Sequence, residues 1–200
     1  LTTIVLAVPL STPVIDGSIR LDGTEWDPGD VVVDDRTDDN TNTSEGHVGR
    51  LLMTWDADNL YVGVTYQDYK LARPDTHALS IFFDLGRGVG PTSAAALDSA
   101  AGAFALPAGD HIDLVIRRDP GQAIPPGALP RVFLVTDGQG SCLPLTGDVT
   151  VAQGTGGAKS GAEALWPLYN HAEFALPWDV IYPDLGGAVP DYAVVKAVAV

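Results

Sequence analysis

Cysteine is nearly absent from this sequence of 200 residues, which contains only Cys142. A single cysteine excludes an intrachain disulfide framework, a zinc cluster built on cysteines and the paired cysteines of a c-type haem attachment. We therefore interpret Cys142 as an inert packing residue. The chain is long enough, and at 46% hydrophobic residues apolar enough, to bury a hydrophobic core without such cross-links.

Basic residues are also scarce. The sequence has 11 lysines and arginines against 26 aspartates and glutamates, which gives a net charge of −15. This charge repels phosphate backbones and anionic lipid surfaces, so it argues against nucleic acid as a partner. The acidic excess has two interpretations: it attracts divalent cations such as calcium, or it keeps the protein soluble in an acidic or salty habitat.

Long apolar runs and helical periodicity are missing as well. Residues 1–10 are apolar but too short to span a bilayer, and they contain Pro9, so we predict an extended strand there and no membrane insertion. Only the alanine-rich residues 92–105 leave room for a short helix or a loop. The first residue is leucine, which suggests a processed secreted protein or a fragment, and we expect an extracellular or cell-surface location.

The sequence does contain the pattern that is typical of an all-β fold. Short runs of aliphatic and aromatic residues are separated by many of the 22 glycines and 15 prolines. We predict one domain over residues 1–200, a two-sheet antiparallel β-sandwich of the jelly-roll or immunoglobulin-like kind. Its expected strands cover residues 3–10, 31–33, 48–55, 60–66, 78–83, 111–117, 131–136, 148–153, 172–176 and 192–200.

The polar residues 34–46 are predicted to form a surface loop. Asp38, Asn40 and Asn42 alternate along it and would present their oxygens to a hard cation such as calcium, although the glycine and the terminal glutamate of an EF-hand loop are missing. Asn42 also begins an N-glycosylation sequon, whose use would compete with calcium there. Further oxygen-rich turns contain Asp56, Asp58 and Asp84. The competing interpretation of all these turns is a solvated acidic surface.

Five segments follow one another in an order and spacing that cover nearly the whole chain: Thr12-Pro-Val-Ile-Asp-Gly17, Glu25-Trp26, Leu52-Met-Thr-Trp-Asp-Ala-Asp-Asn-Leu-Tyr-Val62, Ser80-Ile-Phe-Phe-Asp84 and Glu173-Phe-Ala-Leu-Pro-Trp178. Together they resemble the family 9 carbohydrate-binding modules and the related DOMON-type sandwiches, and the third segment is the most specific. The resemblance implies an extracellular sandwich that binds a ligand without chemistry, often as part of a polysaccharide-degrading or surface-layer protein. The large rings of Trp55, Tyr61 and Trp178 fit the core of such a sandwich.

The aromatic clamp of the sugar-binding relatives has no counterpart here. Residues 71–77, which precede the expected strand at 78–83, contain no aromatic residue, and the chain ends at Val200, before the hairpin that carries the second aromatic in that family. A sandwich without its last strand exposes an unpaired edge. The apolar N-terminus offers Thr3, Ile4, Val5, Leu6 and Val8 to fill it, either in its own sheet or in the sheet of the next copy.

Catalytic chemistry finds little support. The four histidines lie in separate segments without a metalloprotease motif, and there is no Gly-x-Ser-x-Gly elbow. Glu173 and Asp113 are candidate acids for glycoside hydrolysis, but we interpret each as a solvent-facing strand residue. We therefore predict that the protein is not an enzyme.

Two functions from different classes remain. The first is an extracellular structural protein, a surface or filament subunit that assembles with copies of itself by β-strand donation and is stabilised by calcium. The alternative is a carbohydrate-binding module that binds a glycan through aromatic residues outside the lost clamp. The candidates for that role are Trp26, Trp166 and Tyr169.

Overall fold

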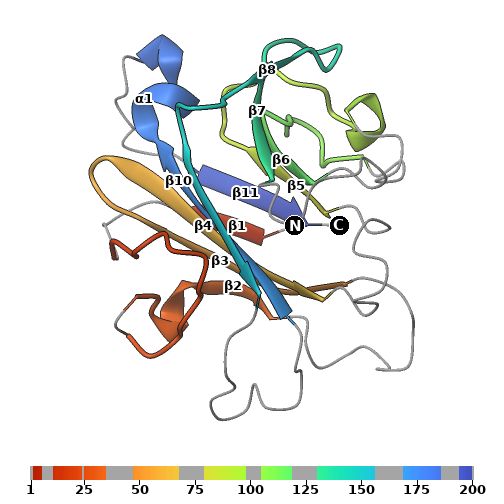
Figure 1. The fold of residues 1–200 in the computed structure, drawn as a ribbon. Coiled ribbons are helices and arrows are strands. Elements are labelled where there is room, and N and C mark those ends of the chain that lie inside the picture. The colour runs from red at the N-terminus through yellow and green to blue at the C-terminus, as the bar shows by residue number, and fades with distance from the viewer. Residues whose placement is uncertain are drawn as a thin grey trace.

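Eleven β-strands dominate the part of the chain that the computed structural model describes (Figure 1). The described residues are 2–5, 11–23, 25–34, 47–67, 79–97, 105–118, 130–155, 169–185 and 194–199. The strands are β1 (Thr2–Val5), β2 (Val31–Asp34), β3 (His47–Trp55), β4 (Asn59–Gln67), β5 (Leu79–Asp84), β6 (Leu114–Arg118), β7 (Arg131–Val135), β8 (Cys142–Pro144), β9 (Thr150–Thr155), β10 (Tyr169–Pro177) and β11 (Val194–Ala199). The helical turns are η1 (Pro28–Asp30), η2 (Ala94–Ala96), α1 (Trp178–Ile181) and η4 (Pro183–Leu185).

The strands form two antiparallel sheets. One has the order β1-β11-β5-β6-β7-β8 and the other the order β2-β3-β4-β10-β9. The predicted all-β, two-sheet sandwich is therefore confirmed. The expected strands at 48–55 and 60–66 correspond to β3 and β4, which form a hairpin in which Trp55 lies opposite Leu60. Of the alanine-rich residues 92–105, only 94–96 are helical among those described.

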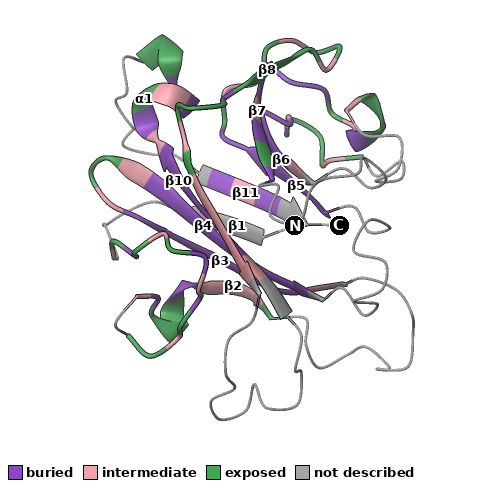
Figure 2. Cartoon of the chain, viewed as in Figure 1, coloured by how far each residue is buried: buried purple, intermediate pink, exposed green. Residues whose placement is uncertain are grey.

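The main hydrophobic core lies between the sheets. Both sheets contribute fully buried side chains to it, among them Leu51 and Phe174 from one sheet and Ile81 and Leu114 from the other. Trp55 and Trp178 belong to this core, as predicted. Figure 2 shows the buried residues concentrated along the central strands of both sheets.

Two smaller cores cover the outer faces of the sheets, and strand periodicity explains them. Leu52 and Tyr61 point away from the main core because they alternate with residues that belong to it, and they pack against Trp26 of the N-terminal segment. Phe82 does the same on the other sheet, where it packs against Ala94. The uninterrupted apolar runs of β3 and β5 are thus strands buried on both faces.

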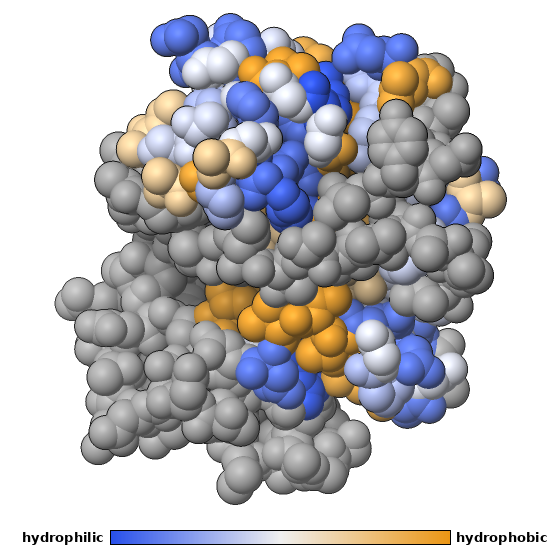
Figure 3. Space-filling model, turned by 180° about the vertical axis from the view of Figure 1, so that it is seen from behind, coloured by the Kyte–Doolittle hydropathy of each residue, from blue (hydrophilic) through white to orange (hydrophobic). Residues whose placement is uncertain are grey.

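Viewed from behind, the described surface mixes hydrophilic and apolar residues in its upper part and has a larger apolar patch below (Figure 3).

Candidate functional site

The outer edge of the six-stranded sheet is formed by β1, which lies beside β11 (Figure 1). The register places Thr2 opposite Ala197, Thr3 opposite Lys196, Ile4 opposite Val195 and Val5 opposite Val194. Leu6 and Val8, the other two predicted donation residues, lie outside the described residues. Within the single chain, β1 thus fills the edge beside the last strand in its own sheet, which is one of the two arrangements expected from the sequence.

On its other side, β11 is held by β5 and by an ion pair. Val195 and Ala197 are buried in the main core, and Lys196 lies between them in the sequence and projects to the opposite face. Its Nζ donates to Asp110 and lies 3.7 Å from Oδ2 of Asp84, its neighbour on β5. The hydrogen bond to Asp110 raises the pKa of Lys196. The strand that receives β1 is therefore attached independently of β1.

From Ser11 onward the chain attaches to the other sheet. The backbone N–H of Ser11 donates to Oγ1 of Thr54 at 3.2 Å, and the Ser11 hydroxyl donates to Oδ2 of Asp30 at 3.2 Å. The Thr12 hydroxyl donates to Oδ2 of Asp56 at 2.8 Å. We call this group the Ser11–Thr12 anchor. Thr54 is fully buried on β3, so the anchor joins the chain to the interior of the five-stranded sheet.

The carboxylate of Asp30 is the buried acceptor of this anchor. Asp30 is 1% exposed, and its Oδ2 also accepts the backbone N–H of Asp27 at 2.8 Å. Burial raises the pKa of Asp30, and the hydrogen bonds from Asp27 and Ser11 offset part of that rise. A buried carboxylate needs such donors, because without them its desolvation would be uncompensated.

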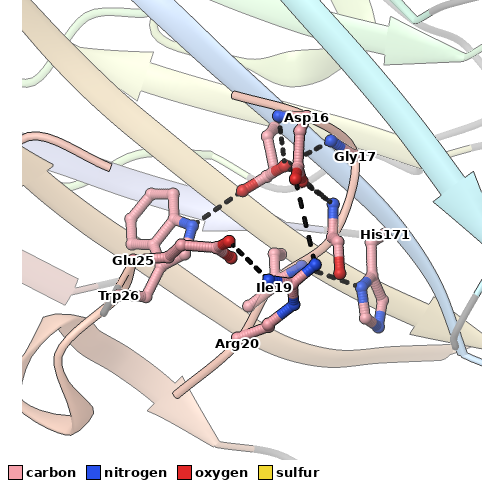
Figure 4. A network of polar contacts seen from close by, with 9 residues as sticks. Asp16, Gly17, Ile19, Arg20, Glu25, Trp26 and His171 are labelled. Carbon is pink, nitrogen blue, oxygen red and sulfur yellow. Dashed lines mark hydrogen bonds and ion pairs between the residues drawn. The ribbon is translucent and has the colours of Figure 1, made fainter. Parts of the chain in front are cut away.

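A second attachment follows a few residues later, around the fully buried Glu173 of β10 (Figure 4). Its Oε2 accepts three successive backbone N–H groups, from Asp16 at 3.2 Å, Gly17 at 2.6 Å and Ser18 at 3.0 Å. Its Oε1 accepts the indole N–H of Trp26 at 2.7 Å. Burial raises the pKa of Glu173, and these donors oppose the rise. Four donors on one carboxylate make Glu173 a structural acceptor that holds the N-terminal segment on the sheet.

Neighbouring contacts extend this attachment. The N–H of Ile19 donates to Nδ1 of His171 at 3.0 Å, which leaves Nδ1 without a proton. Arg20 pairs with Glu25 at 2.9 Å between the guanidinium and Oε1. Figure 4 shows these side chains converging from the N-terminal segment and β10.

The close approach of the segment to β9 requires glycine at position 17. Gly17 has φ of +88°, and a Cβ there would lie 2.7 Å from the carbonyl carbon of Gln153. At the facing position, a Cβ on Gly154 would lie 2.2 Å from the Gly17 carbonyl oxygen. The turn at Asp16 and Gly17 is therefore also a packing contact.

The predicted metal ligands do not come together among the described residues. Asp38, Asn40 and Asn42, including the glycosylation sequon, lie outside them. Oδ1 of Asp56 accepts the N–H groups of its own turn, Oδ2 accepts two hydroxyls, and Asp58 is exposed in that turn. Asp84 accepts the N–H of Gly86 at 2.8 Å and pairs with Lys196. The described part of the chain contains no group of three acidic, histidine or cysteine side chains placed to hold a metal ion.

Of the three predicted glycan-binding aromatics, one has a described side chain, and it is buried. Trp26 has 0% exposed surface and packs against Ile19 and Tyr61, so its ring offers no face for a sugar to stack on. That assignment was wrong, because the ring covers the outer face of the sheet. Tyr169 is the first residue of β10, but its side chain is not among those described. Trp166 lies outside the described residues.

Three further sequence interpretations need correction. Glu173 and Asp113, expected to face solvent, are both 0% exposed. Oδ2 of Asp113 accepts the N–H groups of Leu85 at 3.1 Å and Arg87 at 2.9 Å, so it orders the turn after β5. Cys142, expected to pack inside, is exposed on the edge strand β8. Hydrophobic periodicity could not predict these three environments, because neither a buried acid nor a short exposed edge strand produces such a periodicity.

No protein-family model matches the sequence, and no curated protein matches it either. No helix among the described residues is long and apolar enough to cross a membrane.

Proposed function

We propose that the protein is a non-enzymatic, extracellular structural subunit that assembles with copies of itself when residues 2–5 of one copy pair with β11 of the next. The observation that carries the proposal is the position of β1. It is an edge strand of four residues whose only sheet neighbour in the described chain is β11. The same backbone register can form with β11 of another copy, because strand pairing depends on backbone groups that every copy shares.

The geometry supports donation over glycan binding. The acceptor strand β11 is attached to β5 and to Asp110 without any contribution from β1, so it persists when β1 leaves. Trp26 is buried and cannot serve as a sugar platform. Head-to-tail donation does not close on itself, so it builds filaments or surface arrays.

A mixing experiment tests the proposal. Two single variants, Ile4→Cys and Val195→Cys, are made with Cys142→Ser, and they are mixed after partial unfolding and oxidised during refolding. Ile4 and Val195 are direct partners in the register, so a disulfide-linked heterodimer is expected if β1 pairs between copies. A mixture of Val14→Cys and Val195→Cys is the matched control, because Val14 is 59% exposed and has no place in β1.

The outcomes separate the two functions. A heterodimer in the first mixture and none in the control, with filaments of the native protein in electron micrographs, supports the subunit proposal. Unlinked monomers in both mixtures and in micrographs contradict it. In that case glycan binding is the function to test next, with an array of polysaccharides.

A further inference from the structure

The Ser11–Thr12 anchor divides the N-terminal region into two parts with different partners. Residues 2–5 pair with the six-stranded sheet, whereas Ser11 and Thr12 bond to Thr54, Asp30 and Asp56 at the five-stranded sheet. Only the five residues 6–10 connect them. The first sheet therefore holds the strand proposed to exchange, and the second holds the chain that follows it.

More buried polar contacts are described for the chain downstream of Ser11 than for β1. Residues 11–23 and 25–26 are held by the buried carboxylates of Asp30 and Glu173, by the His171 imidazole and by the burial of Trp26. Removing this segment from its sheet would leave several buried donors and acceptors without partners, each at a cost of about 1–3 kcal/mol. Removing β1 breaks a four-residue edge pairing whose groups can bond to water or to another copy.

We infer that the segment that leaves its own sheet, which we call the exchanging arm, ends before Ser11. We also infer that the arm enters a second copy that packs directly against the donor. This inference rests on the proposed function and limits its geometry. Six residue steps from Val5 to Ser11 span at most about 20 Å when fully extended. The β11 strand of the second copy must therefore lie within that distance of the donor's Ser11–Thr12 anchor, so the two sandwiches abut.

Two disulfide locks in the Cys142→Ser protein test where the arm ends. In Ser11→Cys/Thr54→Cys the two hydroxyl oxygens that the sulfurs replace are 3.1 Å apart, so oxidation locks the anchor within one chain. In Ile4→Cys/Val195→Cys oxidation locks β1 in its own sheet. Both variants are oxidised as monomers, and assembly is then followed by sedimentation before and after reduction.

We expect the oxidised anchor variant to assemble as fully as its reduced form, and the oxidised β1 variant to lose assembly until it is reduced. Loss of assembly on oxidation of the anchor variant, with recovery on reduction, would overturn the inference while leaving strand donation intact. Failure of the reduced proteins to assemble, together with no heterodimer between the single-cysteine variants, would overturn both.

A second measurement avoids dependence on the folding of the anchor variant. Ten Gly-Ser residues are inserted between Leu6 and Ala7 of the donor, and the disulfide-linked heterodimer is studied by small-angle X-ray scattering. Its maximum dimension should increase relative to the parent heterodimer, because the short arm no longer limits the separation. The same insertion between Gly138 and Gln139, in an exposed turn, is the control and should leave the separation unchanged. Equal dimensions for the parent and the lengthened arm would contradict the inference.

Discussion

The indole nitrogen of Trp26 donates to the carboxylate of Glu173 at 2.7 Å across 147 positions of sequence, and neither side chain is exposed to solvent. This bond joins the N-terminal segment to the central part of the five-stranded sheet. It also places one carboxylate where three backbone N–H groups of residues 16–18 converge. The segment is thereby held by its backbone as well as by its side chains.

Replacing Glu173 by alanine should destabilise the protein by about 3 kcal/mol, because four donors, two of them in buried hydrogen bonds, lose their acceptor. Replacing it by glutamine should cost less, since one carbonyl oxygen remains to accept. Urea unfolding followed by tryptophan fluorescence measures both. Asp179→Ala, at an exposed position, is the matched control and should change stability by less than about 0.5 kcal/mol. Equal effects of Glu173→Ala and the control would show that the network is not a structural attachment.

Gly17→Ala should lower stability more than Gly23→Ala. Both glycines have positive φ, so both substitutions carry backbone strain of about 1 kcal/mol. Only at Gly17 does the new Cβ meet backbone atoms, the nearest at 2.7 Å, whereas nothing lies within 4 Å at Gly23. The difference between the two thermal midpoints therefore measures the close contact with Gln153. Identical midpoints would mean that the segment does not pack against β9 in solution.

Stability should increase on mild acidification. Burial raises the pKa of Asp30 and Asp84 above the value in an unfolded chain. Between the unfolded pKa, about 3.9, and the higher folded pKa, the folded state binds more protons, so stability rises as the pH falls through that window. The thermal midpoint should be higher at about pH 5 than at about pH 7.5. Hydrogen bonds lower the pKa of Asp56 despite its desolvation, so its contribution is lost only at still lower pH.

The variant Asp30→Asn should show a smaller rise of the thermal midpoint on acidification, because it removes one of the groups that titrate. A midpoint that falls steadily from neutral pH downward in the native protein would contradict the assignment. Differential scanning fluorimetry across a pH series is sufficient for both proteins.

The candidate calcium ligands that no described contact occupies include those in residues 38–42. The described oxygens of Asp56 and Asp84 already accept protein donors. We therefore expect added calcium to raise the thermal midpoint by mass action and Asp38→Ala/Asn40→Ala to abolish the rise, whereas Asp58→Ala should retain it. A midpoint that is the same with calcium and with a chelator would remove calcium from the proposal.

Deleting residues 1–10 should leave the β11 edge without its neighbour. The shortened protein is expected to bind a synthetic peptide of residues 1–10 and not a scrambled peptide of the same composition. Fluorescence anisotropy of the labelled peptides measures the difference. Similar binding of both peptides would indicate non-specific apolar contact and not strand pairing.

Most of the strands were predictable, because each expected strand overlaps a described one, from residues 48–55 with β3 to residues 192–200 with β11 (Val194–Ala199). The exception is β8, a short strand whose three residues are all exposed and include Pro144, so no hydrophobic pattern marks it. The burial of Trp55 and Trp178 also followed from size and apolarity.

The polar interior was not predictable from pattern. Glu173 lies on a strand face that is usually exposed to solvent, and only the fold reveals that Ile19 and Trp26 cover that face. The same packing buries Trp26, which sequence alone could not distinguish from an exposed binding aromatic. Asp113 is similar, because its carboxylate accepts backbone N–H groups of the turn after β5, and backbone donors of this kind leave no mark in the sequence.

The pairing of β1 with β11 also has a consequence for synthesis. The two strands are the first and the last made of all those described, so the first waits about 10 to 40 s on the ribosome for its partner to be translated. During that time a finished neighbouring chain already has a complete β11. Under the proposed strand donation, nascent chains crowded on one messenger would therefore favour exchange between molecules over self-pairing, and the spacing of ribosomes would influence that choice.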